Sequence, residues 1–270
     1  MSSNQPQQDL IFFTDNSLIP SDVLSSQASY LSIITHVQGT SPTWLINSLI
    51  ETALMGTASV VNSDLKRIPK RSNVLVASFS HPHEFYVRNC KKNGLDLSSN
   101  PQFEFVDCFS TLFTELVSKP SDAKRDVDAL FDKIVKRVTN PNMAVFIEAP
   151  ETLLYATNIS SSDLLFNLTK INKNCRQLYV ISSKDYPQYV DFDTTNPQDV
   201  SFKTTDFLVK LHHRSSLNIT LEPLSTGRAK DITGSITISR GSIPYETVKV
   251  NEREYIYHVT KDSNVKLYFR

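Results

Sequence analysis

The fold of this chain is decided by residues 31–56, LSIITHVQGTSPTWLINSLIETALMG. The apolar run Leu31–Thr35 predicts a buried strand, and the residues after it predict a turn. Ser41 is expected to cap the following helix, with Pro42 at its first position, where a missing N–H costs nothing. Apolar residues then recur at helical spacing, and Gly56 can take the left-handed conformation that closes a helix. Nucleotide-binding proteins place their phosphate loop in this order of strand, turn and helix.

The turn lacks the residues that grip a triphosphate. A phosphate loop needs two glycines separated by four residues, followed by Lys and then by Ser or Thr. Here the turn has Gly39 alone, and Trp44 occupies the position of the second glycine. None of the six glycines in the chain is followed by Lys. The sequence therefore predicts the scaffold of a nucleotide site without its chemistry, with no catalytic residue and no cofactor.

Charge and cysteine content favour an intracellular protein without a metal. The 270 residues include 28 basic and 28 acidic side chains, so nucleic acid could be attracted only by a local patch. The three cysteines form no CxxC pair, which is typical of a reduced protein, and His81, His83 and Cys90 would make a poor ligand set. We expect no signal peptide and no membrane-spanning segment, because no apolar run is long enough.

Strands and helices are predicted to alternate up to residue 182. Besides residues 31–35, strands are expected at 10–13, 74–79, 103–107, 144–147 and 178–181. Helices are expected at 43–56, 82–94, around 112–117, from the cap Ser121 to a stop at Pro141, and around 164–171. This alternation indicates an α/β fold with a mainly parallel sheet and helices on both faces.

The pattern changes after residue 182. Residues 186–205 are expected to form a long loop. Strand-like runs follow at 207–211, 217–221, 232–239, 254–259 and 265–269, with little helix between them. We predict a single domain over residues 1–270, with a parallel core at about 10–182 and a C-terminal antiparallel extension at about 204–270.

Three groups of side chains are candidate site residues. Glu148 ends a central strand, where a nucleotide hydrolase would hold magnesium; without a partnering Lys, we interpret it as capping a helix or pairing across a subunit interface. The dense basic run Lys66, Arg67, Lys70 and Arg71 is a candidate RNA-binding patch, with a solvated loop as the alternative. Arg228 and Lys230 are candidate subunit-interface residues that could reach a neighbour's phosphate site, or else exposed cations of a hairpin.

Several segments together carry a resemblance to one known family. They are residues 9–13 (DLIFF), 33–36 (IITH), 42–47 (PTWLIN), 51–52 (ET), 146–154 (FIEAPETLL), 226–236 and 266–270 (KLYFR). In this combination, and nearly from end to end, the chain resembles the family of the sixth subunit of the Elongator complex. The resemblance implies a RecA-like fold that has lost its phosphate loop.

The same resemblance implies partners and a location. It implies a heterohexameric ring formed with two related RecA-like Elongator subunits, in two copies each. That ring binds tRNA and belongs to a larger catalytic assembly that modifies the wobble uridine, in the cytoplasm and also in the nucleus. The segments after Glu148 and after Ser183 would lie where such rings place their channel loops. The second of these segments is rich in acid, which weakens its case as an RNA contact.

Two other functions remain open from the residues alone. One is a nucleotide hydrolase subunit with a non-standard site that a neighbouring subunit completes. The other is an interaction module that contacts neither RNA nor nucleotide.

Overall fold

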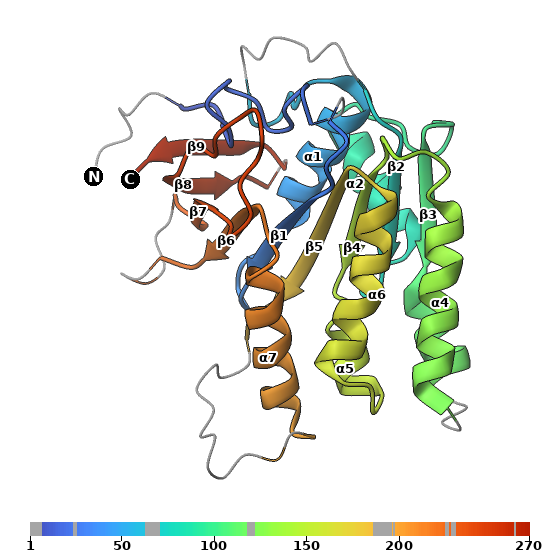
Figure 1. Ribbon diagram of the computed structural model, residues 1–270. Coiled ribbons are helices and arrows are strands. Elements are labelled where there is room, and N and C mark those ends of the chain that lie inside the picture. The colour runs from blue at the N-terminus through green and yellow to red at the C-terminus, as the bar shows by residue number, and fades with distance from the viewer. Residues whose placement is uncertain are drawn as a thin grey trace.

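The computed structural model describes residues 7–23, 26–62, 71–117, 122–185, 196, 198–224, 227, 231–261 and 263–270. In this part of the chain, nine strands form one sheet in the order β3-β2-β4-β5-β1-β6-β7-β8-β9 (Figure 1). The strands are β1 (Tyr30–His36), β2 (Val74–Ser78), β3 (Phe103–Asp107), β4 (Ala144–Glu148), β5 (Gln177–Ser183), β6 (Leu217–Glu222), β7 (Gly234–Arg240), β8 (Arg253–Val259) and β9 (Val265–Phe269).

The sheet is parallel from β3 to β6 and antiparallel from β6 to β9. The predicted α/β class, with a mainly parallel sheet and a C-terminal antiparallel extension, is confirmed, and the arrangement is consistent with a RecA-like fold. Strand β6 still pairs in parallel with β1, so the antiparallel pairing begins only with β7.

Helices cover both faces of the sheet. They are α1 (Thr43–Met55), α2 (His83–Lys92), α3 (Cys108–Thr111), the π-helical turn η1 (Leu112–Leu116), α4 (Ala123–Arg137), α5 (Thr152–Ala156), α6 (Ser161–Asn174) and α7 (Val200–His212). Helices α1 and α2 pack against one face, and α3, η1 and α4 to α7 pack against the other (Figure 1). None of the helices in the described ranges has the length and apolarity that crossing a membrane requires.

Burial on both faces explains the continuous apolar runs in the sequence. All five residues of β2 and of β4 are buried, and neighbouring residues face opposite layers: Val76 and Phe146 join the core beneath α1 and α2, whereas Leu75 and Val145 join the core beneath α4 to α7. A strand between two helical layers has no face left for polar alternation. These strands were therefore readable from the sequence.

Two strand predictions are wrong. Residues 207–211 lie in helix α7, which also takes the end of the predicted loop 186–205. Phe207, Leu208 and Leu211 are buried at helical spacing against the sheet, and the carboxylate of Asp199 starts the helix by accepting from the backbone N–H groups of Ser201 and Phe202. A run of five mostly apolar residues is too short to distinguish the periodicity of a helix from that of a strand. Residues 10–13 form no regular strand, since only Phe13 makes a bridge, to Val250.

Helix ends differ from the prediction in detail. Helix α1 has Pro42 rather than Ser41 at its N-cap, without a side-chain cap, whereas Gly56 closes it as expected, with φ of 78°. Helix α4 begins after Asp122, whose carboxylate accepts from the backbone N–H of Arg125, and the predicted cap Ser121 lies outside the described residues. The short helix α5 was not predicted.

Candidate functional site

The candidate site is the edge of the sheet at which the parallel strands β2, β4, β5, β1 and β6 end. The pairing places Ser78 opposite Glu148, and Ser183 opposite His36. Open α/β sheets bind their ligands beyond the carboxyl ends of the strands. This edge, termed the carboxyl edge below, is thus where a nucleotide would lie in a related hydrolase.

Glu148 is held by side chains of its own chain. It is 5% exposed, and its Oε2 atom accepts hydrogen bonds from the Ser78 hydroxyl (2.6 Å) and from the Tyr86 hydroxyl. His81 Nδ1 lies 3.0 Å from the same oxygen and 3.1 Å from Oε1. Because an ionised carboxylate only accepts, Nδ1 carries the proton. The ring of His81 also stacks on Phe85, with centroids 3.8 Å apart.

These contacts keep the Glu148 carboxyl ionised. Burial alone would raise its pKa, but the hydrogen bonds and charge of His81, with the hydrogen bonds of Ser78 and Tyr86, outweigh burial and hold the pKa below its usual range. Burial beside this carboxylate raises the pKa of the Tyr86 hydroxyl well above its usual range. The four side chains therefore form a satisfied network in which Glu148 is the acceptor.

A second glutamate at this edge has the opposite electrostatics. Glu151 is 3% exposed, and its Oε1 atom accepts from the backbone N–H of Ser183 (2.7 Å), which ties the turn after β4 to the end of β5. Its Oε2 atom is buried and has no hydrogen-bond partner among the residues described. Burial, assisted by the charge of Glu148, raises the pKa of the Glu151 carboxyl to about 7.

Replacing Glu151 with glutamine is expected to remove a pH dependence of stability. With a raised pKa, the folded carboxyl binds a proton that the unfolded one releases, so its favourable contribution is complete below pH 4.5 and is lost as the pH rises through 7. The shift corresponds to roughly 3 kcal/mol at most. Urea unfolding of both proteins should show the E151Q variant gaining stability over the parent between pH 4.5 and pH 8.

Glu222→Gln provides the control for Glu151, because Glu222 also ends a strand at this edge but is half exposed and pairs with Lys184. The difference in free energy of unfolding between the Glu222→Gln variant and the parent should stay nearly constant over this pH range. If the free energy of unfolding changed with pH equally in E151Q and in the parent, Glu151 would already be ionised at neutral pH.

The turn after β1 is occupied by a carboxylate of the same chain. The backbone N–H of Gln38 donates to Asp185 Oδ1 at 2.6 Å. The backbone N–H of Thr40 donates to the carbonyl of Val37 at 3.0 Å, and the Thr40 hydroxyl donates to the same carbonyl at 2.7 Å. Pro42, at the helix N-cap, has no N–H to offer. Two of the donors that a phosphate loop would turn toward phosphate are therefore bound within the protein, and the N–H at position 42 is missing.

His36, at the end of β1, is also part of this edge. Burial lowers the pKa of its imidazole, although the charges of Asp185 and Glu148 act against burial. Its Nδ1 atom is buried and has no hydrogen-bond partner in the part of the chain that the structure describes. A neutral ring at this position offers no positive charge to an anion.

The structure does not bring the predicted site residues together. Lys66, Arg67, Lys70, Arg228 and Lys230 lie outside the described residues, so their roles stay predictions. Arg71 is described and exposed. It precedes β2, at the opposite end of the strand from Ser78, the residue that pairs with Glu148. Glu148 points to partners in its own chain, and its proposed role at a subunit interface stays a prediction.

Sequence reasoning missed Glu151 and the partners of Glu148. Ser78 and Tyr86 gave no signal, because a serine in an apolar strand and a tyrosine on a helix are unremarkable. The register of β2 against β4 is what makes Ser78 the neighbour of Glu148. In the sequence, His81 is a candidate only for a metal site, and Asp185 belongs to the acid-rich segment after Ser183.

Fold and site together define a RecA-like α/β protein without a phosphate loop. No protein-family model matches the sequence. The chain is 32% identical over 276 residues to Elongator complex protein 6 of Saccharomyces cerevisiae, with 98% of each protein covered. It is 25% identical over 201 residues to the Elongator complex protein 6 homolog of Schizosaccharomyces pombe, covering 71% of this chain and 77% of that protein. The chain belongs to the Elongator complex protein 6 family, which confirms the resemblance seen in the sequence.

Proposed function

We propose that this chain is a non-catalytic subunit of a heterohexameric RecA-like ring in the Elongator complex. In this proposal it supports modification of the tRNA wobble uridine through ring assembly and tRNA binding. Its partners are two related RecA-like Elongator subunits and the larger catalytic assembly. It acts in the cytoplasm and the nucleus. Both relatives carry the name of an Elongator complex protein, which supports the complex as its place of action.

One observation carries the non-catalytic part of the proposal. The Asp185 carboxylate accepts the Gln38 backbone N–H at 2.6 Å, in the turn where a phosphate loop would hold phosphate. A fixed negative charge in this turn repels a triphosphate instead of attracting it. No lysine of the turn is available to compensate, since residues 36–43 contain none. The usefulness of this chain therefore lies in its contacts with other molecules.

The tRNA-binding part rests on the basic run before β2. Cations on a loop can reach phosphates without burying their charge, and several phosphate contacts add up to strong binding. Arg71, the described member of this run, is exposed. The acidic segment after Ser183 is a poorer candidate, because Asp185 there already binds within the protein.

The alternative is a nucleotide hydrolase subunit whose site is completed by a neighbour. The position of Glu148 favours it, since an ionised carboxylate at the end of a central strand can hold a metal-bound water. Against it, the hydrogen bonds of Ser78, Tyr86 and His81 already occupy this carboxylate.

Titration of Mg-ATP into the isolated chain by calorimetry tests whether this chain holds a nucleotide without a neighbour. We expect no saturable heat up to about 1 mM nucleotide, which corresponds to binding weaker than about −4 kcal/mol. Asp185→Asn is the informative variant, because it removes the carboxylate from the turn while leaving an acceptor for Gln38. This variant should bind Mg-ATP no better than the parent, because the lysine of a phosphate loop is still missing. Micromolar binding by the parent chain, with turnover, would contradict the non-catalytic assignment.

A further inference from the structure

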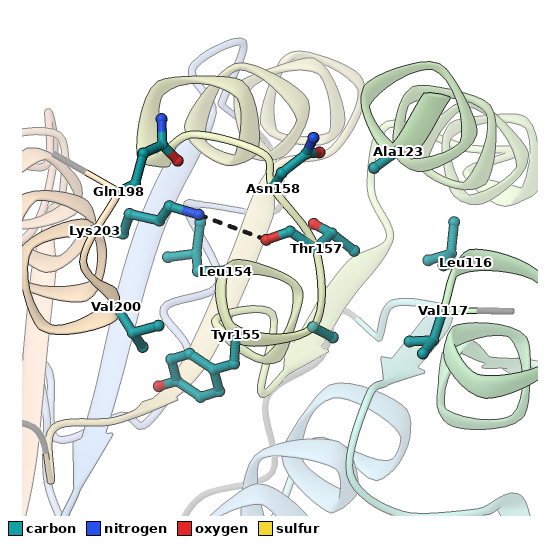
Figure 2. A pocket seen from close by; sticks show the side chains of 11 residues that line it. Leu116, Val117, Ala123, Leu154, Tyr155, Thr157, Asn158, Gln198, Val200 and Lys203 are labelled. Atoms are coloured by element: carbon teal, nitrogen blue, oxygen red, sulfur yellow. Dashed lines mark hydrogen bonds between the residues drawn. The ribbon is translucent and has the colours of Figure 1, made fainter. Parts of the chain in front are cut away.

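A pocket of about 430 Å³ opens on the face of the sheet covered by α4 to α7 (Figure 2). It lies between α5 and its connection to α6, the start of α7 and the end of η1. Most of its wall is apolar, with contributions from Leu116, Val117, Leu154 and Val200. Two amide side chains, Asn158 and Gln198, also line it. The pocket is separate from the carboxylate networks of Glu148 and Glu151 described above.

A buried lysine lines this pocket. Lys203 is 6% exposed, and its Nζ atom donates one long hydrogen bond, 3.5 Å, to the backbone carbonyl of Thr157 (Figure 2). An ammonium group has three donors. Among the described residues, no carboxylate lies within ion-pair distance of it. Lys203 therefore carries donor capacity that the described protein does not use, at a position where an unpaired charge is expensive.

Another lysine of the same helix has hydrogen-bond and ion-pair partners for its ammonium group. Lys210, about two turns further along α7, pairs with the Asp206 carboxylate and donates to the Ser162 hydroxyl at 2.9 Å. Its side chain is about one third exposed. The helix can thus supply a lysine with acceptors, and Lys203 differs in both burial and partners.

We propose that this pocket binds a monocarboxylate carried on an apolar body. The carboxylate accepts from Lys203 Nζ, with the amides of Asn158 and Gln198 as further donors, and the apolar body packs against Leu116, Val117 and Val200. One buried cation matches one negative charge, whereas a phosphate dianion would need a second cation to offset its desolvation. The pocket shares none of its lining residues with the Glu148 and Glu151 networks at the carboxyl edge, and this inference does not rest on the proposed function.

The test is a titration of the full chain with four small probes and one peptide. Hexanoate has both the charge and the tail, hexanamide has the tail alone, acetate has the charge alone, and inorganic phosphate has neither tail nor single charge. We expect hexanoate to bind with a dissociation constant on the order of 1 mM, as befits so small a ligand. Hexanamide, acetate and phosphate should each bind at least tenfold more weakly. An acetylated Leu-Glu-Leu amide that binds more tightly than hexanoate would identify the source as a peptide side chain rather than a free acid.

Variants on the pocket wall decide whether the signal comes from this site. Lys203→Met keeps the volume and removes the charge, so hexanoate affinity should fall at least tenfold while hexanamide affinity is unchanged. Lys210→Met, the same substitution on the same helix, should leave both affinities unchanged. If Lys203→Met does not fold, Val200→Phe tests the pocket by filling it, and should abolish hexanoate binding. Equal binding of hexanoate and hexanamide, tighter binding of phosphate, or no hexanoate binding at about 10 mM would overturn the proposal. Full hexanoate affinity in Lys203→Met or in Val200→Phe would overturn it as well.

Discussion

Replacing Glu148 with alanine is expected to lower the free energy of unfolding by about 4 kcal/mol. The substitution leaves Ser78, Tyr86 and His81 without their common acceptor, and the first two side chains are at most 1% exposed. A buried donor without a partner costs about 1–3 kcal/mol. Urea unfolding at pH 7, followed by tyrosine fluorescence and by circular dichroism, measures the change.

The pH dependence gives this prediction a second readout. Because the pKa of Glu148 is lowered in the folded protein, its contribution is present above the unfolded value of 4.5 and is lost as the pH falls through the folded value. The difference in free energy of unfolding between the parent and E148A should therefore become smaller below pH 4.5. Glu148→Gln, which keeps one acceptor, should cost about half as much, and Glu222→Ala, with its half-exposed ion pair, less than about 1 kcal/mol. If E148A lost as little free energy of unfolding as Glu222→Ala, the hydrogen-bond network of Glu148 would not stabilise the carboxyl edge.

If the proposed ring binds tRNA through the basic run, reversing the charge of Lys66, Arg67, Lys70 and Arg71 is expected to weaken that binding about 100-fold. Each of these cations would neutralise one phosphate, and the four glutamates would repel them. The dependence of log affinity on log salt should become shallower by about 3, because each phosphate contact contributes roughly 0.7 on single-stranded RNA. Filter binding at four salt concentrations measures both quantities.

A second charge-reversed protein controls for the change in net charge. Lys249, Arg253, Lys261 and Lys266 are exposed on the antiparallel extension, and their replacement by glutamate alters the charge by the same amount. This variant should keep its salt dependence and most of its affinity. Unchanged affinity in the first variant would remove the basic run from the RNA-binding surface, and equal losses in both would reduce the effect to net charge.

The layered fold was predictable because burial leaves a simple pattern in the sequence. Strands covered on both faces appear as apolar runs, as in β2 and β4, and Gly56 marked the end of α1 correctly. The segment 207–211 shows the limit of this reasoning. Five apolar or mixed residues fit both the helical and the strand periodicity. The N-cap at Asp199, which starts the helix, lies eight residues upstream of this segment.

The site was less predictable, because its contacts depend on strand register. Asp185 and Gln38 are separated by 147 positions, and the parallel pairing of β1 with β5 is what brings them together. Lys203 looked like one more cation of a long loop. It is buried because α7 forms and packs on the sheet, which no local pattern indicated.

Native mass spectrometry of this chain, co-expressed with its two expected RecA-like Elongator partners, is the decisive experiment. It asks whether a chain with the layout of a nucleotide hydrolase, but with its own carboxylate in the phosphate turn, acts by joining related subunits. The account predicts one complex that contains two copies of each of the three chains. A chain that stays monomeric in the presence of both partners would contradict it.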